Sequence, residues 1–264
     1  MTQSDRNGTK PRLSAEQRRH WDAEGHVLLP SFFDGSQIDL MARWVDEIAR
    51  WPVVEGKYLN YYELVGDKKV LSRTENFLPY HDQFRRFLEE CGIYDVMAEI
   101  IGEPVVLFKE KIHYKSPGTG DYPAHQDGHS HASSPYAVQL YHRMVMIFLD
   151  AADEKNGCLV LGSGHEKSTL LAKDASGALK PEVVSALQWA PCPCPPGSAF
   201  LFDTYLPHFS ATNKSDAARR TIFLTFNGVS KGDLREAHIR DRATPKPNSR
   251  EIKPNLVPQT RLKD

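Results

Sequence analysis

The chain falls into two parts that differ in the spacing of their hydrophobic positions. In the N-terminal part, apolar side chains recur every three or four residues, which is the period of amphipathic helices. Ser14 followed by Gln17 forms a capping-box pattern that marks the start of the first helix. Helices are predicted at residues 14–25, 36–51, 83–91 and 94–101, and a short strand at residues 26–30.

After residue 104 the pattern changes to short runs of β-branched and aromatic residues separated by Gly, Pro, Asn and Asp. Such runs predict a sandwich or barrel, and the long connections at 116–136 and 162–186 are typical places for binding residues. The residues after Ala237 are rich in Pro, Lys, Arg and Asn, which predicts an extended or disordered tail. Strands are predicted at residues 105–114, 138–149, 158–161, 187–190, 199–202 and 219–226.

Composition adds to this picture mainly by arguing against nucleic-acid binding, membrane binding and secretion. The 264 residues suit one large domain or two small ones, and 33 Lys and Arg against 34 Asp and Glu give a formal net charge of -1. No overall field therefore favours nucleic acid or an anionic membrane. The longest apolar run, residues 144–149, is far shorter than the roughly 18 residues of a membrane span, and the polar N-terminus shows no secretory signal. We expect a cytoplasmic protein with neither nucleic acid nor membrane as a partner.

The four cysteines are too few for a disulfide framework in a chain of this length. Cys192 and Cys194 form a weak zinc signal, because a closed zinc site needs four soft ligands and the sequence offers no second pair. We expect structural thiols.

The chemical signal lies in the β-rich part. His125 and Asp127 are two residues apart, so in an extended segment both side chains point to the same face. One more histidine would complete a facial triad of two histidines and one carboxylate, which leaves three positions of an octahedral iron(II) open for a co-substrate and oxygen. His208, just after the apolar run 199–202, is the candidate third ligand.

Arg219 opens the last predicted strand, and its guanidinium suits bidentate capture of a carboxylate. It could hold the distal end of a dicarboxylate whose keto-acid end chelates the metal. Alternation along the strand puts Thr221 on the same face, so the two residues would form an anion-binding pair. Taken alone, Arg219 and Arg220 could equally form a solvated basic edge.

These residues stand in motifs that resemble the phytanoyl-CoA dioxygenase family of iron(II)/2-oxoglutarate oxygenases over most of the chain. The resembling stretches are residues 22–30, 114–120 leading to His125 and Asp127, 156–159 with 162–165, and 196–198 leading to His208 and Arg219. The resemblance implies metal ligands His125, Asp127 and His208, and Arg219 on the 5-carboxylate of 2-oxoglutarate. A halogenase relative would have a small residue in place of the acid, so Asp127 argues against that activity.

The resemblance also implies a mainly β fold with helices, a double-stranded β-helix (a jelly roll, cupin-like) buttressed by N-terminal helices. The whole chain, 1–264, would be a single oxygenase domain. Its parts would be a helical buttress and lid at about 12–103, the double-stranded β-helix core at 104–230 and an extended tail at 238–264.

One predicted strand carries an unusual row of cations. Alternation puts Lys109, Lys111, His113 and Lys115 on one face, while Phe108 shares the other with Glu110, Ile112 and Tyr114. By family analogy the face bearing His113 points to the co-substrate, so we expect His113 and Lys111 to assist 2-oxoglutarate and Lys109 to meet an anionic substrate. The alternative is a solvated edge strand blunted by lysines.

The segment before the barrel resembles the subgroup that hydroxylates small organophosphonates, the 2-aminoethylphosphonate dioxygenase-like enzymes. There Arg73, with a lysine or His113, would bind the phosphonate, while Glu75, Asn76 and Tyr61 would meet the ammonium group. His129 would face the substrate or the surface.

The expected reaction hydroxylates a small anionic or zwitterionic metabolite, best an aminoalkylphosphonate such as 2-aminoethylphosphonate or its N-methylated analogue at the carbon next to phosphorus. It would use Fe(2+), 2-oxoglutarate and O2, release succinate and CO2, and be helped by ascorbate in vitro. Three alternatives stay open: hydroxylation of another small polar metabolite, a non-catalytic ligand-binding double-stranded β-helix, and a zinc hydrolase, which would leave Arg219 without a task. The oligomeric state also stays open, a homodimer included.

Overall fold

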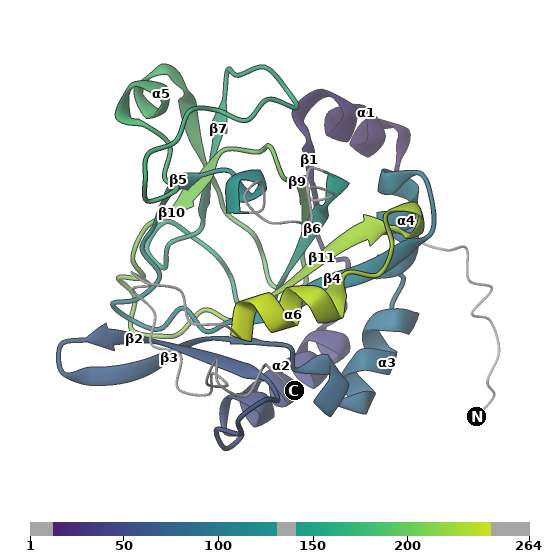
Figure 1. The fold of residues 1–264 in the computed structure, drawn as a ribbon, viewed down its shortest axis with the longest axis vertical. Helices are drawn as coiled ribbons and strands as arrows, with labels where there is room; N and C mark the ends of the chain where they lie inside the picture. The colour runs from purple at the N-terminus through teal and green to yellow at the C-terminus, as the bar shows by residue number, and fades with distance from the viewer. Residues whose placement is uncertain (1–12, 131–140, 244–264) are drawn as a thin grey trace.

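The computed structural model describes residues 13–130 and 141–243, and two facing antiparallel sheets form its centre (Figure 1). The larger sheet has seven strands in the order β1-β9-β6-β11-β4-β3-β2, and the smaller has four in the order β5-β10-β7-β8. The larger sheet contains β1 (His26–Leu29), β2 (Leu59–Val65), β3 (Lys68–Glu75), β4 (Val105–His113), β6 (Arg143–Phe148), β9 (Ala199–Asp203) and β11 (Thr221–Gly228). The smaller contains β5 (Tyr122–His125), β7 (Leu159–Ser163), β8 (Gln188–Cys192) and β10 (His208–Ser210). This arrangement confirms the predicted jelly roll.

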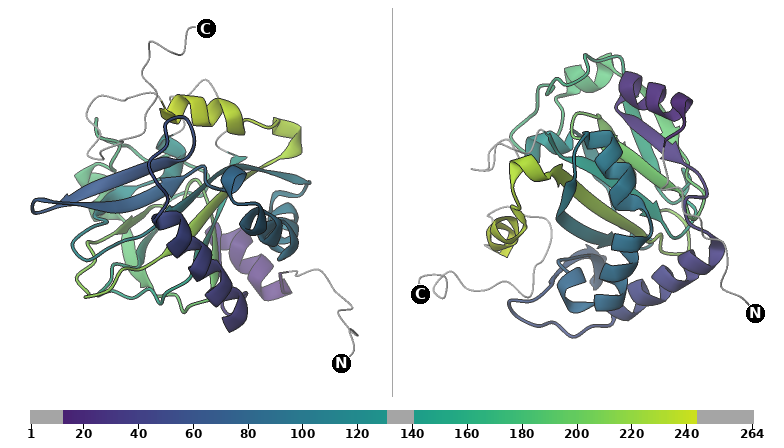
Figure 2. Two further views of the ribbon diagram at one scale, coloured as in Figure 1. Left: turned by 90° about the horizontal axis from the view of Figure 1, so that it is seen from below. Right: turned by 90° about the vertical axis from the view of Figure 1, so that its right-hand side faces the viewer.

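The first four helices cover the outer face of the larger sheet, as the N-terminal pattern predicted (Figure 2). The helices are α1 (Ala15–Glu24), α2 (Gly35–Ala49), α3 (Asp82–Glu90), α4 (Ile93–Ile101), α5 (Pro181–Ala186) and α6 (Arg235–Ala243). Capping boxes at Ser14 and Asp34 start α1 and α2. Each satisfies backbone N–H groups that have no partner in the first helical turn.

Strand β11 shows how alternation divides the interior into two compartments. Its apolar residues Ile222, Leu224 and Phe226 are fully buried in the core beneath the helices. Such burial is worth about 1.5–3 kcal/mol for each side chain. The alternate residues, Thr221 and Phe223 among them, face the space between the two sheets, and that space holds the site described below.

Part of the predicted helical buttress is in fact a β-hairpin. Strands β2 and β3 extend the larger sheet at its edge, and a turn at Gly66 and Asp67 joins them. Gly66 has φ +57°, which glycine adopts without steric cost, and a Gly-Asp pair between two strand-like runs is a hairpin signal. The helical period on either side obscured it.

The predicted extended tail is also wrong in its first part, because residues 238–243 continue helix α6. Asp233 accepts a hydrogen bond from the Arg235 backbone N–H at 3.0 Å, next to the first turn of the helix. The remaining tail residues lie outside the described part of the chain, as do residues 131–140, which include the first three of the strand predicted at 138–149. That strand begins at Arg143 rather than at residue 138.

Candidate metal centre and active site

Three predicted metal ligands come together at the end of the smaller sheet. His125 ends β5, Asp127 begins a short 3-10 turn, and His208 begins β10, where its backbone pairs with that of His125. One ligand atom from each lies within 4.8 Å of the other two. The Nε2 atom of His125 is 3.7 Å from Oδ1 of Asp127, and the two imidazole centroids are 4.3 Å apart. Asp127 reaches the site from the turn, not from the extended segment that the spacing suggested.

The surroundings of both imidazoles leave the same nitrogen for a metal. Nδ1 of His125 lies 2.8 Å from the carbonyl oxygen of Pro123, and Nδ1 of His208 lies 3.0 Å from that of Leu206. A carbonyl only accepts, so each Nδ1 must carry the proton and each Nε2 keeps its lone pair. Outer contacts of this kind orient histidine ligands in metal sites.

The protonation states also suit a metal. Burial and the neighbouring His125 lower the pKa of His208 to about 4, so the imidazole stays neutral. Burial raises the pKa of Asp127, but the adjacent His125 and His208 outweigh it and hold that pKa well below its usual value. Two neutral imidazoles and one carboxylate are the donor set of an iron(II) oxygenase centre, and the geometry here fits that ion.

The loop that carries the ligands is pinned by the residue between them. The side chain of Gln126 donates to the carbonyl oxygens of Thr169 and Tyr205 and accepts from the backbone N–H of Leu171 at 2.7 Å. The amide is buried, and these bonds tie the His-x-Asp segment to two other loops.

The triad borders a cavity of about 270 Å³ between the sheets. Basic side chains outnumber acidic ones in its lining. The lining consists of Arg73, Glu75, Lys109, Lys111, His113, Lys115, Tyr122, His125, Asp127, Met146, Leu159, His208, Ser210, Arg219, Phe223, His238, Asp241 and Arg242.

One end of the cavity is built around Arg219. Its guanidinium donates to Thr221 Oγ1 at 3.0 Å and to the carbonyl oxygen of Gly157 at 3.1 Å, and only 5% of the residue is exposed. Lys115 donates to the same carbonyl at 2.9 Å and to Ser210 Oγ at 2.6 Å. Burial and the charge of Arg219 lower the pKa of Lys115 to about 7.

Such a pair of buried cations calls for an anion. Within the described residues, the Nε atom of Arg219 has no hydrogen-bond partner, and the acceptors of its other nitrogens are neutral. A buried charge without a counterion is strongly unfavourable, so the carboxylate of a bound dicarboxylate would complete this end of the cavity. The sequence put Lys115 on the correct face but gave no sign that it lies beside Arg219.

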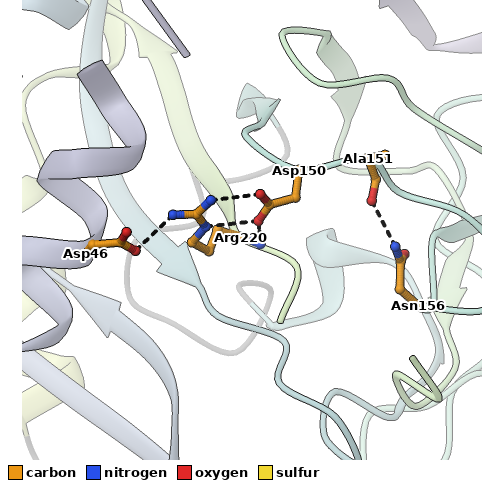
Figure 3. A network of polar contacts seen from close by, with 5 residues as sticks. All are labelled: Asp46, Asp150, Ala151, Asn156 and Arg220. Carbon is orange, nitrogen blue, oxygen red and sulfur yellow. Dashed lines mark hydrogen bonds and ion pairs between the residues drawn. The ribbon is translucent and has the colours of Figure 1, made fainter. Parts of the chain in front are cut away.

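The side chain of the next residue, Arg220, leaves the cavity to Arg219. It points the opposite way, donates twice to Asp150 at 2.8 and 3.0 Å, and reaches Asp46 of α2 at 2.9 Å (Figure 3). Its backbone N–H also donates to Asp150. The solvated basic edge that the sequence left open is therefore wrong, because one arginine enters the cavity and the other ties the barrel to the helical layer.

We expect Arg220→Ala to lower both stability and affinity for 2-oxoglutarate. Loss of the partly buried contacts to Asp150 and Asp46 should cost about 1–2 kcal/mol and a few degrees of Tm. The KM for 2-oxoglutarate should rise severalfold because Arg219 loses its anchored neighbour. Arg18→Ala is the control, since Arg18 ties α1 to Glu99 far from the cavity lining. An equal rise of KM in both variants would show that the effect is general destabilisation.

The other end of the cavity is a cluster of charges around Glu75. Arg73 Nε lies 2.9 Å from Glu75 Oε1, and Tyr61 donates to Glu75 Oε2 at 3.1 Å. Burial raises the pKa of Glu75, but the two nearby arginines, Arg242 and Arg73, outweigh it and hold the carboxyl ionised. Burial and the charge of Lys109 lower the pKa of Lys111 to about 7.

Strand β4 supplies the row of cations that the alternation predicted. It lies between β11 and β3, so the alternative of a solvated edge strand is wrong. Lys109, Lys111 and His113 all line the cavity. Phe108 does not follow the alternation: the β4–β11 register shifts at this point, and its ring stacks on His142 at 4.2 Å and lies 4.5 Å from that of His238. A β-bulge of this kind puts two successive side chains on one side.

Three predicted substrate residues lie outside the cavity lining. Asn76, at φ +59°, bonds the carbonyl of Lys57 and accepts from Arg235. His129 is 2.7 Å from the carbonyl oxygen of Leu171. Tyr61 lies behind Glu75, with the Arg73 guanidinium 4.0 Å from its ring. Their contacts support the loops and charges around the site.

Helix α6 supplies lining residues that the sequence did not suggest, namely His238, Asp241 and Arg242. The only usable signal was the helical period of residues 235–243, which the Pro-rich composition of the tail concealed. The thiols of Cys192 and Cys194 are 3.9 Å apart, and within the described ranges the triad is the one group of three or more such ligands. No helix in those ranges is long and apolar enough to cross a bilayer.

Comparison with known proteins agrees with this geometry. A family model described as phytanoyl-CoA dioxygenase (PhyH) matches residues 21–221. This chain belongs to the phytanoyl-CoA dioxygenase family. It is an iron(II)/2-oxoglutarate-dependent dioxygenase, which sets aside the non-catalytic and zinc-hydrolase alternatives.

Two relatives are similar to this oxygenase over most of its length. A methylphosphonate hydroxylase of Gimesia maris is 36% identical over 230 residues, which cover 87% of this chain and 86% of the relative. A 2-aminoethylphosphonate dioxygenase of an uncultured bacterium is 35% identical over 234 residues, 87% of each chain. Among solved structures, EctD of S. alaskensis with 2-oxoglutarate and 5-hydroxyectoine superposes with a TM-score of 0.72 at 17% identity. That match covers 86% of this chain and 80% of EctD and shows the shared fold.

Proposed function

We propose that this oxygenase hydroxylates a small organophosphonate, such as 2-aminoethylphosphonate, at the carbon next to phosphorus. The observation that carries the proposal is the surplus of cations in the cavity beside the triad: Arg73, Lys109 and Lys111 face a cavity end where Glu75 is already paired with arginine. Charge-assisted contacts to such cations suit a phosphonate dianion. Both relatives of about 35% identity carry phosphonate names.

The balanced reaction would convert an alkylphosphonate, 2-oxoglutarate and O2 into the 1-hydroxyalkylphosphonate, succinate and CO2. Iron(II) bound by His125, Asp127 and His208 would supply the activation of oxygen. Arg219, Thr221 and Lys115 would hold the 5-carboxylate of 2-oxoglutarate. His113 would stay neutral beside it, because burial and the nearby Lys111 hold the pKa of this imidazole well below its usual value.

The lysines would orient the substrate. A phosphonate held by Lys109 and Lys111 would lie in the same cavity as the triad, since both lysines and all three candidate ligands line it. The apolar side chains of Met146 and Phe223 in the lining would exclude water from the reacting carbon. A cytoplasmic location stays our prediction for the enzyme.

A substrate panel with matched head groups tests the proposal. Succinate release under iron(II), 2-oxoglutarate, ascorbate and air is compared for methylphosphonate, 2-aminoethylphosphonate, its trimethylammonium analogue, and the sulfonate and carboxylate with the same aminoethyl chain. We expect the phosphonates to stimulate succinate release well above the rate without substrate, and the monoanionic analogues to do so much less. If the enzyme turns over 2-oxoglutarate slowly without substrate and no phosphonate increases succinate release, this substrate class is ruled out.

A further inference from the structure

The cavity lies between the two sheets, but helix α6 also contributes to its wall through His238, Asp241 and Arg242. Figure 1 shows it in yellow-green in front of β4 and beside the β2–β3 hairpin. Arg235 in its first turn donates to the buried Glu110 of β4 at 2.8 Å and to Asn76 at 3.0 Å. His238, one turn later, lies on the ring of Phe108. The helix is thus anchored at its start, and its last turn lies over the charged end of the cavity.

Arg242, in that last turn, contacts the charge cluster around Glu75 from the solvent side. Its guanidinium lies 3.5 Å from Glu75 Oε1 and 5.6 Å from the centroid of Tyr61. Arg73 contacts the same carboxylate at 2.9 Å and the same ring at 4.0 Å from within the sheet. Two guanidinium groups from different elements therefore flank one carboxylate and one aromatic ring.

The charges of this cluster do not balance. The cavity lining contains six Lys and Arg side chains, Lys109 and Lys111 among them, against the three carboxylates of Glu75, Asp127 and Asp241. The side chain of Arg242 is 28% exposed against 9% for Arg73, so Arg242 is the outer of the two arginines. An anion that enters the cavity would lie between it and the lysines.

We infer that Arg242 is a specificity-determining residue that binds the phosphonate dianion together with Arg73, as part of the outer wall that α6 gives the substrate site. The inference rests on the proposed function and adds to it the outer wall of the substrate site. It explains why a helix near the end of the chain, held by a buried ion pair, presents a basic residue to a cavity that already contains an excess of positive charge.

The test compares Arg242→Gln and Arg242→Lys with Arg240→Gln, an exposed arginine on the same helix that does not line the cavity. Initial rates of succinate release are measured against the concentration of methylphosphonate and of 2-aminoethylphosphonate. We expect Arg242→Gln to raise the KM for both phosphonates by about 10- to 100-fold, the loss typical of a charge-assisted hydrogen bond. Arg242→Lys should recover part of this loss. Arg240→Gln should keep the phosphonate KM, the KM for 2-oxoglutarate and the substrate-free turnover of the unaltered enzyme.

The outcomes separate this inference from the proposed function. If the unaltered enzyme gains no succinate release from any phosphonate, the proposed function fails and the inference fails with it. If phosphonates do stimulate the enzyme but Arg242→Gln matches Arg240→Gln in its phosphonate KM, only the role of Arg242 is refuted. A purely structural role of Arg242 would instead change the Tm and the substrate-free turnover, and would leave the phosphonate KM of any folded enzyme as it was.

Discussion

Replacing His208 by alanine is expected to abolish phosphonate-dependent succinate release. The imidazole is buried and held by the carbonyl of Leu206, so its Nε2 atom faces the other two ligand atoms. Changes to the outer partners of metal ligands already cost about 10- to 100-fold in metal affinity or activity, so loss of the ligand itself should cost at least about a hundredfold. Iron(II) titration by calorimetry under nitrogen and succinate release measure the two consequences separately.

His165→Ala is the matched control, because His165 lines a different hollow and is not one of the three ligands. It should bind iron(II) and release succinate at a rate close to that of the unaltered enzyme. Full turnover by His208→Ala with iron(II) affinity unchanged would refute the triad. In that case a residue other than His208 would have to be the third metal ligand.

The sequence was enough to bring the three candidate metal ligands together, because local rules find them. A two-residue spacing and a histidine beside an apolar strand are visible in the sequence, and pairing of β5 with β10 brings the two histidines together. The face of β4 that carries Lys109 and Lys111 followed from alternation for the same reason. Alternation failed only at Phe108, where the β-bulge inserts an unpaired residue that no single-strand pattern indicates.

Helix α6 could not be predicted because long-range contacts decide its place. Its own sequence is polar and its helical period is weak, so nothing local predicts that it covers the cavity. The buried Glu110 on β4 requires a cation, and Arg235 supplies it from a segment far along the chain. Asn76 was assigned to the substrate for a related reason: its polarity was visible, but its contacts to Lys57 and Arg235 were not.

Replacing Arg219 by glutamine is expected to raise the KM for 2-oxoglutarate by about 30-fold or more. Truncating one partner of a buried charge pair typically costs about 2–5 kcal/mol, and about 1.4 kcal/mol corresponds to a tenfold change. Glutamine can still donate to Thr221 or Gly157, so the local fold should be kept while the charge is lost. Lys115 remains beside the vacated position and would retain weak binding. Rates of succinate release against 2-oxoglutarate concentration, at saturating phosphonate, measure the effect.

Arg235→Gln distinguishes loss of this contact from general destabilisation, because it removes a partly buried arginine that pairs with Glu110 and lies outside the cavity lining. That variant should lower the Tm but leave the KM for 2-oxoglutarate near its original value. Arg219→Gln should do the reverse: a buried cation without a counterion gives little stability, so its removal should change the Tm slightly and co-substrate affinity strongly. An unchanged KM in Arg219→Gln would mean that Lys115 alone holds the 5-carboxylate, and the assignment of this end of the cavity would have to be revised.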